Sequence, residues 1–204
     1  MGILERKERD REEMKQLIID AAIHMFLEEG YEKTSIRSIA EKIEYSPATI
    51  YLYYKDKDEL LHNVQREAFE KLDKAFRQKA TAKDPFERLE QIMITYIHFG
   101  KKNPELYDLM FIVQAPMNVV KEKELWRNGH ESFGFLFQCI SECIEKKQIR
   151  YDDPMIASLS VWAMVHGLFS LDLRCRFKVI ETDEKVIEAA IEKSIHEYLK
   201  LIKT

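Results

Sequence analysis

The sequence predicts an all-α protein of nine helices. Glycine and proline number only 6 and 5 among 204 residues, whereas sheets and barrels need many more of them in their turns. Apolar residues recur at helical spacing along the chain, and capping residues interrupt these runs at regular points. Because 46% of the residues are hydrophobic, the chain can bury a packed core.

Start and stop signals place three helices before residue 56. Apolar residues recur from position 17 to 26, on a face that includes Leu17, and Gly30 is expected to end this helix in a left-handed cap. A second helix should run over about 34–43. Ser46 and Pro47 begin the third, because a serine hydroxyl accepts from a free amide and proline has no amide hydrogen to satisfy.

Six longer helices follow. Asp56 and Glu59 form a capping-box-like pair that opens a helix over about 57–80. Similar signals at Asp84-Pro85, Asn103-Pro104, Pro116 with Asn118, Asp153-Pro154 and Thr182 predict helices at about 85–101, 104–114, 118–147, 154–174 and 182–202. Gly129 and Gly134 should lie inside one of them and weaken it. The apolar stretch 156–171 contains three serines and is short for a bilayer, so it predicts a buried helix.

Several classes of function are excluded by what the chain lacks. With 3 cysteines it is not a disulfide-stapled secreted protein, and the charged opening stretch 1–16 is no signal peptide, so we expect a cytoplasmic location and no membrane partner. The sequence contains no nucleophile paired with a base, no carboxylate pair and no glycine-rich phosphate loop. We therefore expect that the protein is not an enzyme and uses no cofactor. Cys139 and Cys143 share a helix face without further ligands, so two buried thiols are expected rather than a metal site.

The two short helices over 34–43 and 47–54 form a helix-turn-helix pattern. A recognition helix needs small side chains near its start, such as Ala48, so that its backbone approaches base edges closely. Hydroxyl groups at the positive helix end bind phosphates, and Ser46, Thr49 and Tyr51 supply them. The net charge of −4 means that such a site must be a local patch.

The runs 26–40 (FLEEGYEKTSIRSIA) and 46–61 (SPATIYLYYKDKDELL) resemble the signature of the TetR family of bacterial transcriptional regulators. The resemblance covers about residues 10–65, and beyond it only the nine-helix layout and a local motif over 162–167 are similar. It implies an N-terminal three-helix helix-turn-helix DNA-binding domain over 1–56. It also implies a C-terminal helical domain over 57–204 that binds an effector and dimerises.

The resemblance also implies roles for single residues. Thr34, Ser35 and Lys57 would hold phosphates, Thr49 and Tyr51 would reach bases or adjacent phosphates, and Tyr53 would lie against the DNA backbone. Tyr54 is expected in the core. Glu44 stands where the family usually has glycine, and a non-glycine residue in that left-handed turn costs about 1 kcal/mol.

Bulky apolar and mixed side chains gather on the predicted C-terminal helices. By the same resemblance these helices enclose an effector cavity, whose expected lining is Tyr96, Phe99, Tyr107, Met110, Phe111, Gln114, Phe133, Phe137, Trp162 and His166. Apolar walls with a few polar groups suit an apolar or aromatic molecule. A solid core built from the same residues, with His166 as an ordinary core histidine, is the alternative.

The predicted function is a ligand-responsive transcriptional repressor that binds a near-palindromic, double-stranded DNA operator as a homodimer and leaves it when a small effector binds. The last helix carries an apolar stripe that includes Ile191 and Ile195, which is too broad for one neighbour and suggests a partner subunit. The alternatives are a helical small-molecule-binding protein and an effector-independent regulator or activator of the same fold.

Overall fold

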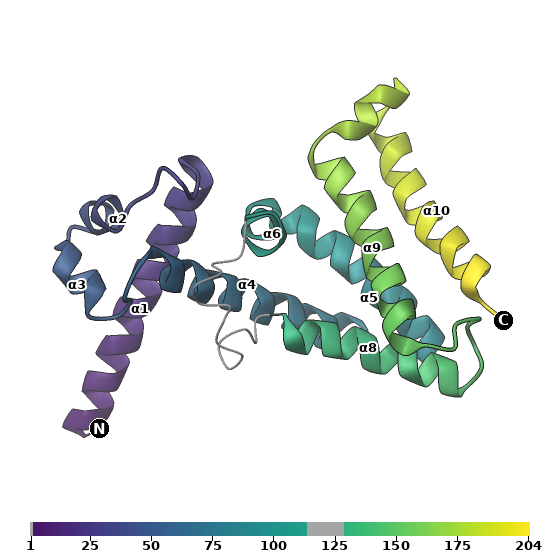
Figure 1. Cartoon of the computed structure of the whole chain (residues 1–204), viewed down its shortest axis with the longest axis horizontal. Helices are drawn as coiled ribbons and strands as arrows, with labels where there is room; N and C mark the ends of the chain where they lie inside the picture. Colours follow the sequence, from purple (N-terminus) through teal and green to yellow (C-terminus); the bar gives the residue numbers. More distant parts are fainter. Residues whose placement is uncertain (1, 114–128) are drawn as a thin grey trace. The chain divides into compact units, whose positions relative to one another are not determined.

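The computed structural model describes residues 2–113 and 129–204. Within these residues the chain forms nine α-helices and one 3-10 helix, and pairing of the strand type is limited to an isolated bridge between Ile149 and Lys203 (Figure 1). The all-α prediction is therefore confirmed. The described residues divide into two compact units, one of residues 2–68 and 105–113, the other of residues 69–104 and 129–204.

The first unit contains α1 (Ile3–Glu28), α2 (Ile36–Lys42), α3 (Pro47–Tyr51), the first half of α4 (Lys57–Lys79) and most of α6 (Pro104–Phe111). Helix α1 begins at Ile3, well before the apolar run that starts at position 17, in a charged stretch where residues four apart pair, as in Arg6–Asp10. The core of the unit is apolar and includes Ile18, Ala22, Phe26, Ile39, Ile50, Leu60, Leu61, Val64 and Leu109. Leu17 does not belong to it, since it is 41% exposed.

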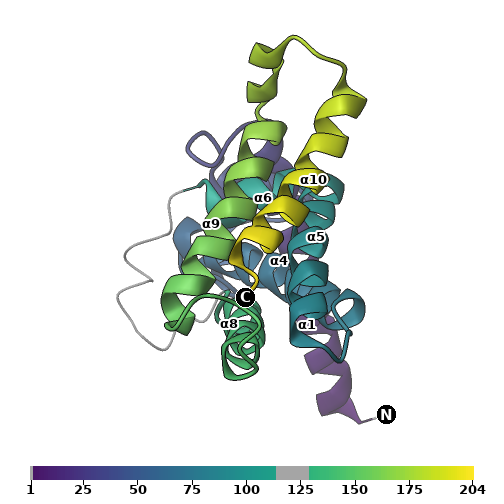
Figure 2. The same cartoon turned by 90° about the vertical axis from the view of Figure 1, so that its right-hand side faces the viewer.

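The second unit is organised around α5 (Pro85–Lys102), which packs against α8 (His130–Glu145), α9 (Pro154–Leu173) and α10 (Glu184–Ile202). The short 3-10 helix η1 (Arg176–Ile180) connects the end of α9 to the start of α10 (Figure 2). The buried apolar residues of the second unit include Leu89, Ile92, Met93, Leu136, Ile140, Val161, Val165, Phe169, Ile191, Ile195 and Leu199.

The predicted helix starts hold at most positions. Asp84 accepts from the amides of Phe86 and Glu87, both at 3.0 Å, and so begins α5. Asp153 begins α9 in the same way. Helix α10 is capped by Asp183 rather than by the predicted Thr182, because the Asp183 carboxylate accepts from the amide of Lys185 at 2.8 Å.

The predicted helix over 118–147 is wrong at Gly129. This residue has φ 77°, a left-handed conformation that an α-helix cannot continue through, so α8 starts at His130. The expected start at Pro116 and Asn118 lies outside the described residues. Gly134, by contrast, lies inside α8 as predicted.

The last two helices refine a second expectation. Ile191 and Ile195 of α10 are 3% and 0% exposed within a single chain, where α10 packs against α5, so these two residues belong to the core of the chain itself. Helix α9 instead keeps an apolar face uncovered, formed by Met155, Ile156, Leu159, Ala163 and Leu171. Among the described residues, α9 is the one helix that is long and apolar enough to cross a membrane. Only 28% of its apolar stretch is buried inside the chain. The prediction of a buried helix holds for one face only.

A glycine in α5 controls the approach of α9, which gives a stability prediction. A Cβ added to Gly100 would lie 2.3 Å from the Phe169 ring, and Phe169 is 1% exposed. Gly100→Ala should therefore lower the free energy of unfolding by about 1–3 kcal/mol in urea denaturation. Gly134→Ala is the matched control, since nothing lies within 4 Å of its added methyl, and it should stabilise by up to about 1 kcal/mol. Equal effects of both changes would contradict the packing described.

Candidate functional site

The α2–turn–α3 segment is a helix-turn-helix whose two short helices are each capped by a serine (Figure 1). The Ser35 hydroxyl accepts from the amide of Ser38 at 3.0 Å, and the Ser46 hydroxyl accepts from the amide of Thr49 at 3.2 Å. Between the helices Glu44 has φ 60°, the left-handed conformation that the sequence predicts for it. The turn is therefore strained by about 1 kcal/mol at a residue that carries a negative charge.

Helix α3 is buried on one side and open on the other. Ile50 is 0% exposed. The helix ends at Tyr51 rather than at the predicted residue 54, and Tyr54, which follows it, is 3% exposed and belongs to the core, as predicted. On the open side Ala48 is exposed and Tyr51 is 56% exposed, while Thr49 and Tyr53 are half-buried. The helix thus offers a small side chain near its start and hydroxyl groups beyond it, which is the surface that a DNA groove requires.

Two of the predicted phosphate ligands are engaged inside the chain. Thr34 is 2% exposed, and its hydroxyl donates to the carbonyl oxygens of Met25 at 3.2 Å and Gly30 at 2.9 Å. The Lys57 ammonium donates to the carbonyl oxygens of Tyr31 at 2.8 Å and Thr34 at 3.1 Å. In this arrangement the Thr34 hydroxyl is not offered to a phosphate, because it holds the turn between α1 and α2.

Tyr31 completes this contact and was missed by the sequence reasoning. Its ring lies 4.2 Å below the Lys57 ammonium, and its hydroxyl donates to the Asp58 carboxylate. Burial and the Asp58 carboxylate both raise the pKa of the Tyr31 hydroxyl, which therefore stays protonated. An aromatic residue three positions before Thr34 was the available signal, but only the fold places it beside α4.

Exposed cations surround the helix-turn-helix, and the sequence reasoning left most of them out. They are Lys33, Arg37, Lys42 and Lys55, all exposed. Arg37 pairs with Glu41 at 3.2 Å in a solvated contact that a phosphate could replace at little cost. For Arg37 and Lys42 the available signal was their position on α2 outside the face that carries the buried Ile36 and Ile39.

In the second unit, five of the predicted effector residues form an aromatic cluster. The Tyr96 hydroxyl and His166 Nδ1 are 2.9 Å apart, and the Trp162 ring centroid lies 6.3 Å from that of His166. Phe133 packs at 6.1 Å from Trp162 and 6.4 Å from Phe137. Burial, with a smaller contribution from Arg174, lowers the pKa of His166, so the imidazole is neutral at pH 7.

The other predicted effector residues that the structure describes are divided between the two units. Phe99 belongs to the second unit and is 9% exposed. Tyr107, Met110 and Phe111 belong to the first unit, where the Tyr107 and Phe111 rings are 5.0 Å apart. Gln114 falls outside the described residues. The half-buried Phe133, Phe137, Trp162 and His166 are therefore the predicted residues that share one partly open surface in one unit.

Two family models match the chain. The model described as bacterial regulatory proteins, tetR family, matches residues 18–64, which include the whole helix-turn-helix. A second model, described as a tetracyclin repressor-like C-terminal domain, matches residues 89–194.

Characterised relatives are similar over part of their length. The fatty acid metabolism regulator protein of Bacillus subtilis is 35% identical over 71 residues, 33% of this chain and 37% of that protein. The transcriptional repressor KstR of Rhodococcus jostii is 26% identical over 49% of this chain and 47% of its own. The regulator AcrR of Shigella flexneri is 24% identical over 72% of each chain.

Solved structures share the fold. A TetR family transcription regulator from Marinobacter aquaeolei superposes with a TM-score of 0.72 at 23% identity, covering 96% of this chain and 98% of its own. The fatty acid degradation regulator FadR from Bacillus halodurans gives a TM-score of 0.70 at 21% identity, covering 91% and 93%.

The exposed face of α3, the serine-capped helices and the two family models lead to one assignment. The first match, over residues 18–64, includes both serine-capped helices, and the second match, over residues 89–194, extends the assignment beyond the helix-turn-helix. The chain belongs to the TetR family of bacterial transcriptional regulators, which are DNA-binding proteins rather than enzymes.

Proposed function

We propose that this protein is a cytoplasmic repressor that binds a near-palindromic operator as a homodimer and leaves it when an apolar or aromatic effector binds. The observation that carries the proposal is the open face of α3, where Ala48 and Tyr51 stand exposed above a buried Ile50. Such a helix enters a major groove with its backbone close to the base edges.

The DNA contacts divide into two kinds. Thr49 and Tyr51 read bases or the nearest phosphates, and Tyr53 lies along the DNA backbone. Phosphates are held by the capped helix starts at Ser35 and Ser46, where backbone amides and the helix dipole favour an anion. The Lys57 ammonium has three N–H donors, and two of them bind backbone carbonyl oxygens, so the third can bind a phosphate. Thr34 positions the turn instead.

The uncovered face of α9 supports a homodimer. Ile156 is 59% exposed and Leu159 is 49% exposed, one turn apart on a helix whose other side packs in the core. A monomer would leave this apolar stripe in water, whereas a second copy related by a two-fold axis would bury the same residues twice. A symmetric dimer presents two α3 helices to the two halves of a palindrome.

The aromatic cluster supports the effector site. Phe133, Phe137 and Trp162 supply apolar contact area, and the neutral His166 supplies a hydrogen bond that orients a polar end. The similarity to a protein named fatty acid metabolism regulator favours an effector with a long apolar chain. The effector shifts the DNA-binding equilibrium only through its different affinities for the bound and released states.

Tyr51 gives the first functional prediction. Tyr51→Ala should weaken binding to DNA fragments selected from a random pool by about tenfold or more, because it removes both the ring and the hydroxyl from the groove face. Tyr51→Phe keeps the ring and should lose less. Both variants should keep wild-type circular dichroism, since Tyr51 is 56% exposed. Unchanged affinity in Tyr51→Ala would remove α3 from the DNA interface.

The dimer prediction uses two leucines of similar exposure. Leu159→Glu should shift the protein to monomers in light scattering, because a carboxylate buried in an apolar interface loses its hydration. Leu17→Glu is the control, since Leu17 is 41% exposed on α1, in the other unit. A stable dimer in Leu159→Glu, or dissociation by both variants, would place the interface elsewhere.

The effector prediction uses Trp162 as its reporter. In a Trp126→Phe background, medium- and long-chain fatty acids should change Trp162 fluorescence and release the selected DNA. His166→Leu should weaken fatty-acid binding about twofold to tenfold through the lost hydrogen bond. His130→Leu, at an exposed site on α8, should leave binding unchanged. If fatty acids bind without releasing DNA, the regulator is effector-independent; if neither occurs, the effector is of another class.

A further inference from the structure

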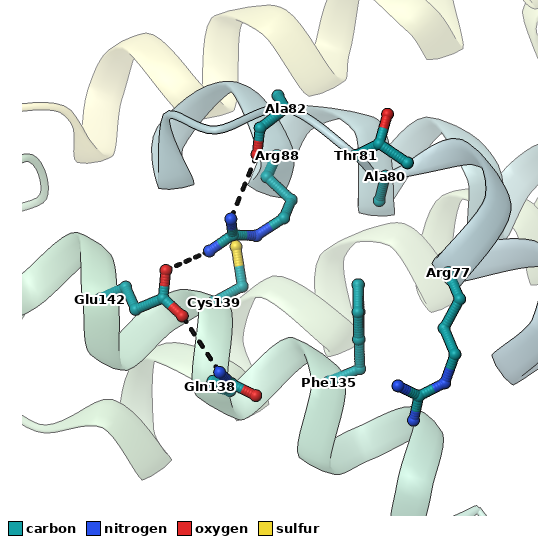
Figure 3. A pocket seen from close by; sticks show the side chains of 9 residues that line it. All are labelled: Arg77, Ala80, Thr81, Ala82, Arg88, Phe135, Gln138, Cys139 and Glu142. Carbon is teal, nitrogen blue, oxygen red and sulfur yellow. Dashed lines mark hydrogen bonds and ion pairs between the residues drawn. The ribbon is translucent and has the colours of Figure 1, made fainter.

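The second unit contains a groove of about 420 Å³ between the end of α4, the loop before α5, α5 itself and α8 (Figure 3). Its charged side chains are already paired inside the chain. Arg88 bonds to Glu142 and to the carbonyl oxygen of Ala82, as Figure 3 shows. Arg77 pairs with Asp73 at 2.8 Å. A charged ligand would have to break these ion pairs to bind in the groove.

The open face of α3 is different, because its apolar side chains are left in water. Ala48, Tyr51 and Leu52 are three and four positions apart, so they lie on one side of the helix, away from the buried Ile50. Leu52 directly follows α3 and keeps helical backbone angles, φ −72° and ψ −19°. It is 77% exposed, more than Tyr51 beside it. Apolar side chains gathered on one exposed face mark a surface that another molecule covers.

The side chains that read guanine, adenine and cytosine are missing from this helix. Residues 46–54 have the sequence SPATIYLYY, without arginine, lysine, asparagine, glutamine, aspartate or glutamate. In the major groove arginine and lysine bind guanine, asparagine and glutamine bind adenine, and carboxylates bind cytosine. The Thr49 hydroxyl is 3.0 Å from the Ser46 hydroxyl, so part of its hydrogen-bonding capacity is used in the helix cap. What α3 mainly offers to a base is therefore apolar contact.

The cations of the helix-turn-helix flank α3 in the sequence and do not belong to it. Lys33, Arg37 and Lys42 precede the helix, Lys55 follows it, and all four side chains are exposed. Such side chains bind phosphates, which carry no sequence information. An apolar helix face with cations on both sides complements a DNA major groove, where phosphates border the base edges.

We propose that Ala48, Tyr51 and Leu52 pack against the 5-methyl groups of thymine, so that each operator half-site presents thymine rather than guanine to α3. This inference rests on the proposed function, because it requires α3 to enter the major groove. It adds Leu52 to the DNA contacts and states which kind of base edge the helix selects.

Two effects select thymine at this face. Its methyl group is an apolar group on the major-groove edge, so contact with Leu52 removes apolar surface of both partners from water. Guanine presents two acceptors there, O6 and N7, of which the Tyr51 hydroxyl can satisfy only one. The other acceptor would lose its water without a replacement, which is unfavourable. The same face therefore attracts thymine and rejects guanine.

Uracil tests the methyl group alone, because it differs from thymine only in lacking that group. The full chain first selects its binding sequence from a random DNA pool. Each thymine of a selected half-site is then replaced by uracil, one at a time, and the dissociation constant is measured at fixed salt. At one or more positions we expect affinity to fall about fourfold for each methyl group removed. At such a position 5-methylcytosine, which returns the methyl group, should bind more tightly than cytosine.

Leu52→Ala tests whether this side chain makes the methyl contact. It should weaken binding to the thymine operator, and uracil should cost less affinity in this variant than in the wild-type chain, because both changes remove the same contact. Leu17→Ala is the matched control, since Leu17 is a leucine of the same unit that is 41% exposed on α1. It should keep both the affinity and the full cost of uracil. Circular dichroism checks that each variant is folded.

Three results would overturn this inference and leave the proposed function in place. They are equal binding of uracil and thymine at every position, selected half-sites that share no thymine, and a uracil cost of full size in folded Leu52→Ala. A chain that selects no sequence from the pool would overturn the proposed function as well.

Discussion

The DNA-binding unit depends on the two hydrogen bonds that the Lys57 ammonium donates to backbone carbonyl oxygens. Lys57 is the first residue of α4 and reaches the carbonyl oxygens of Tyr31 and Thr34, in the segment that leads into α2. Hydrogen bonds from a charged donor contribute about 1.5–3 kcal/mol, more than those between neutral groups. They fix the end of α1, the start of α2 and the start of α4 against one another.

Everything that α3 offers to DNA follows from this fixed frame. Helix α3 spans only five residues, too few to be stable alone, so its orientation comes from Ile50 in the core and from the Ser46 cap. The strained Glu44 turn persists because the core on both sides of it over-determines the backbone. A short helix held in this way can expose small and aromatic side chains without losing its place.

In the second unit, α5 packs against three other helices, α8, α9 and α10. Close packing is possible where Gly100 lets the Phe169 ring approach, and this fixes which side of α9 is buried. The opposite side then remains apolar and uncovered.

The sequence alone determined the local features of the protein. Helix starts at Ser46, Asp84 and Asp153, the left-handed Gly30 and Glu44, and the helix-turn-helix itself follow from interactions within a few residues, which a linear pattern records directly. The match of the N-terminal family model over residues 18–64 covers the same local pattern.

The tertiary structure decided which side of each helix is covered. It turned Thr34 and Lys57 toward backbone carbonyls, assigned Ile191 and Ile195 to the core, and left a face of α9 open. It also placed Cys139 of α8 beside Arg88 of α5, although 51 positions separate the two residues in the sequence. Periodicity shows that a helix has an apolar face but not which distant element meets it, because that depends on contacts between residues far apart in the chain.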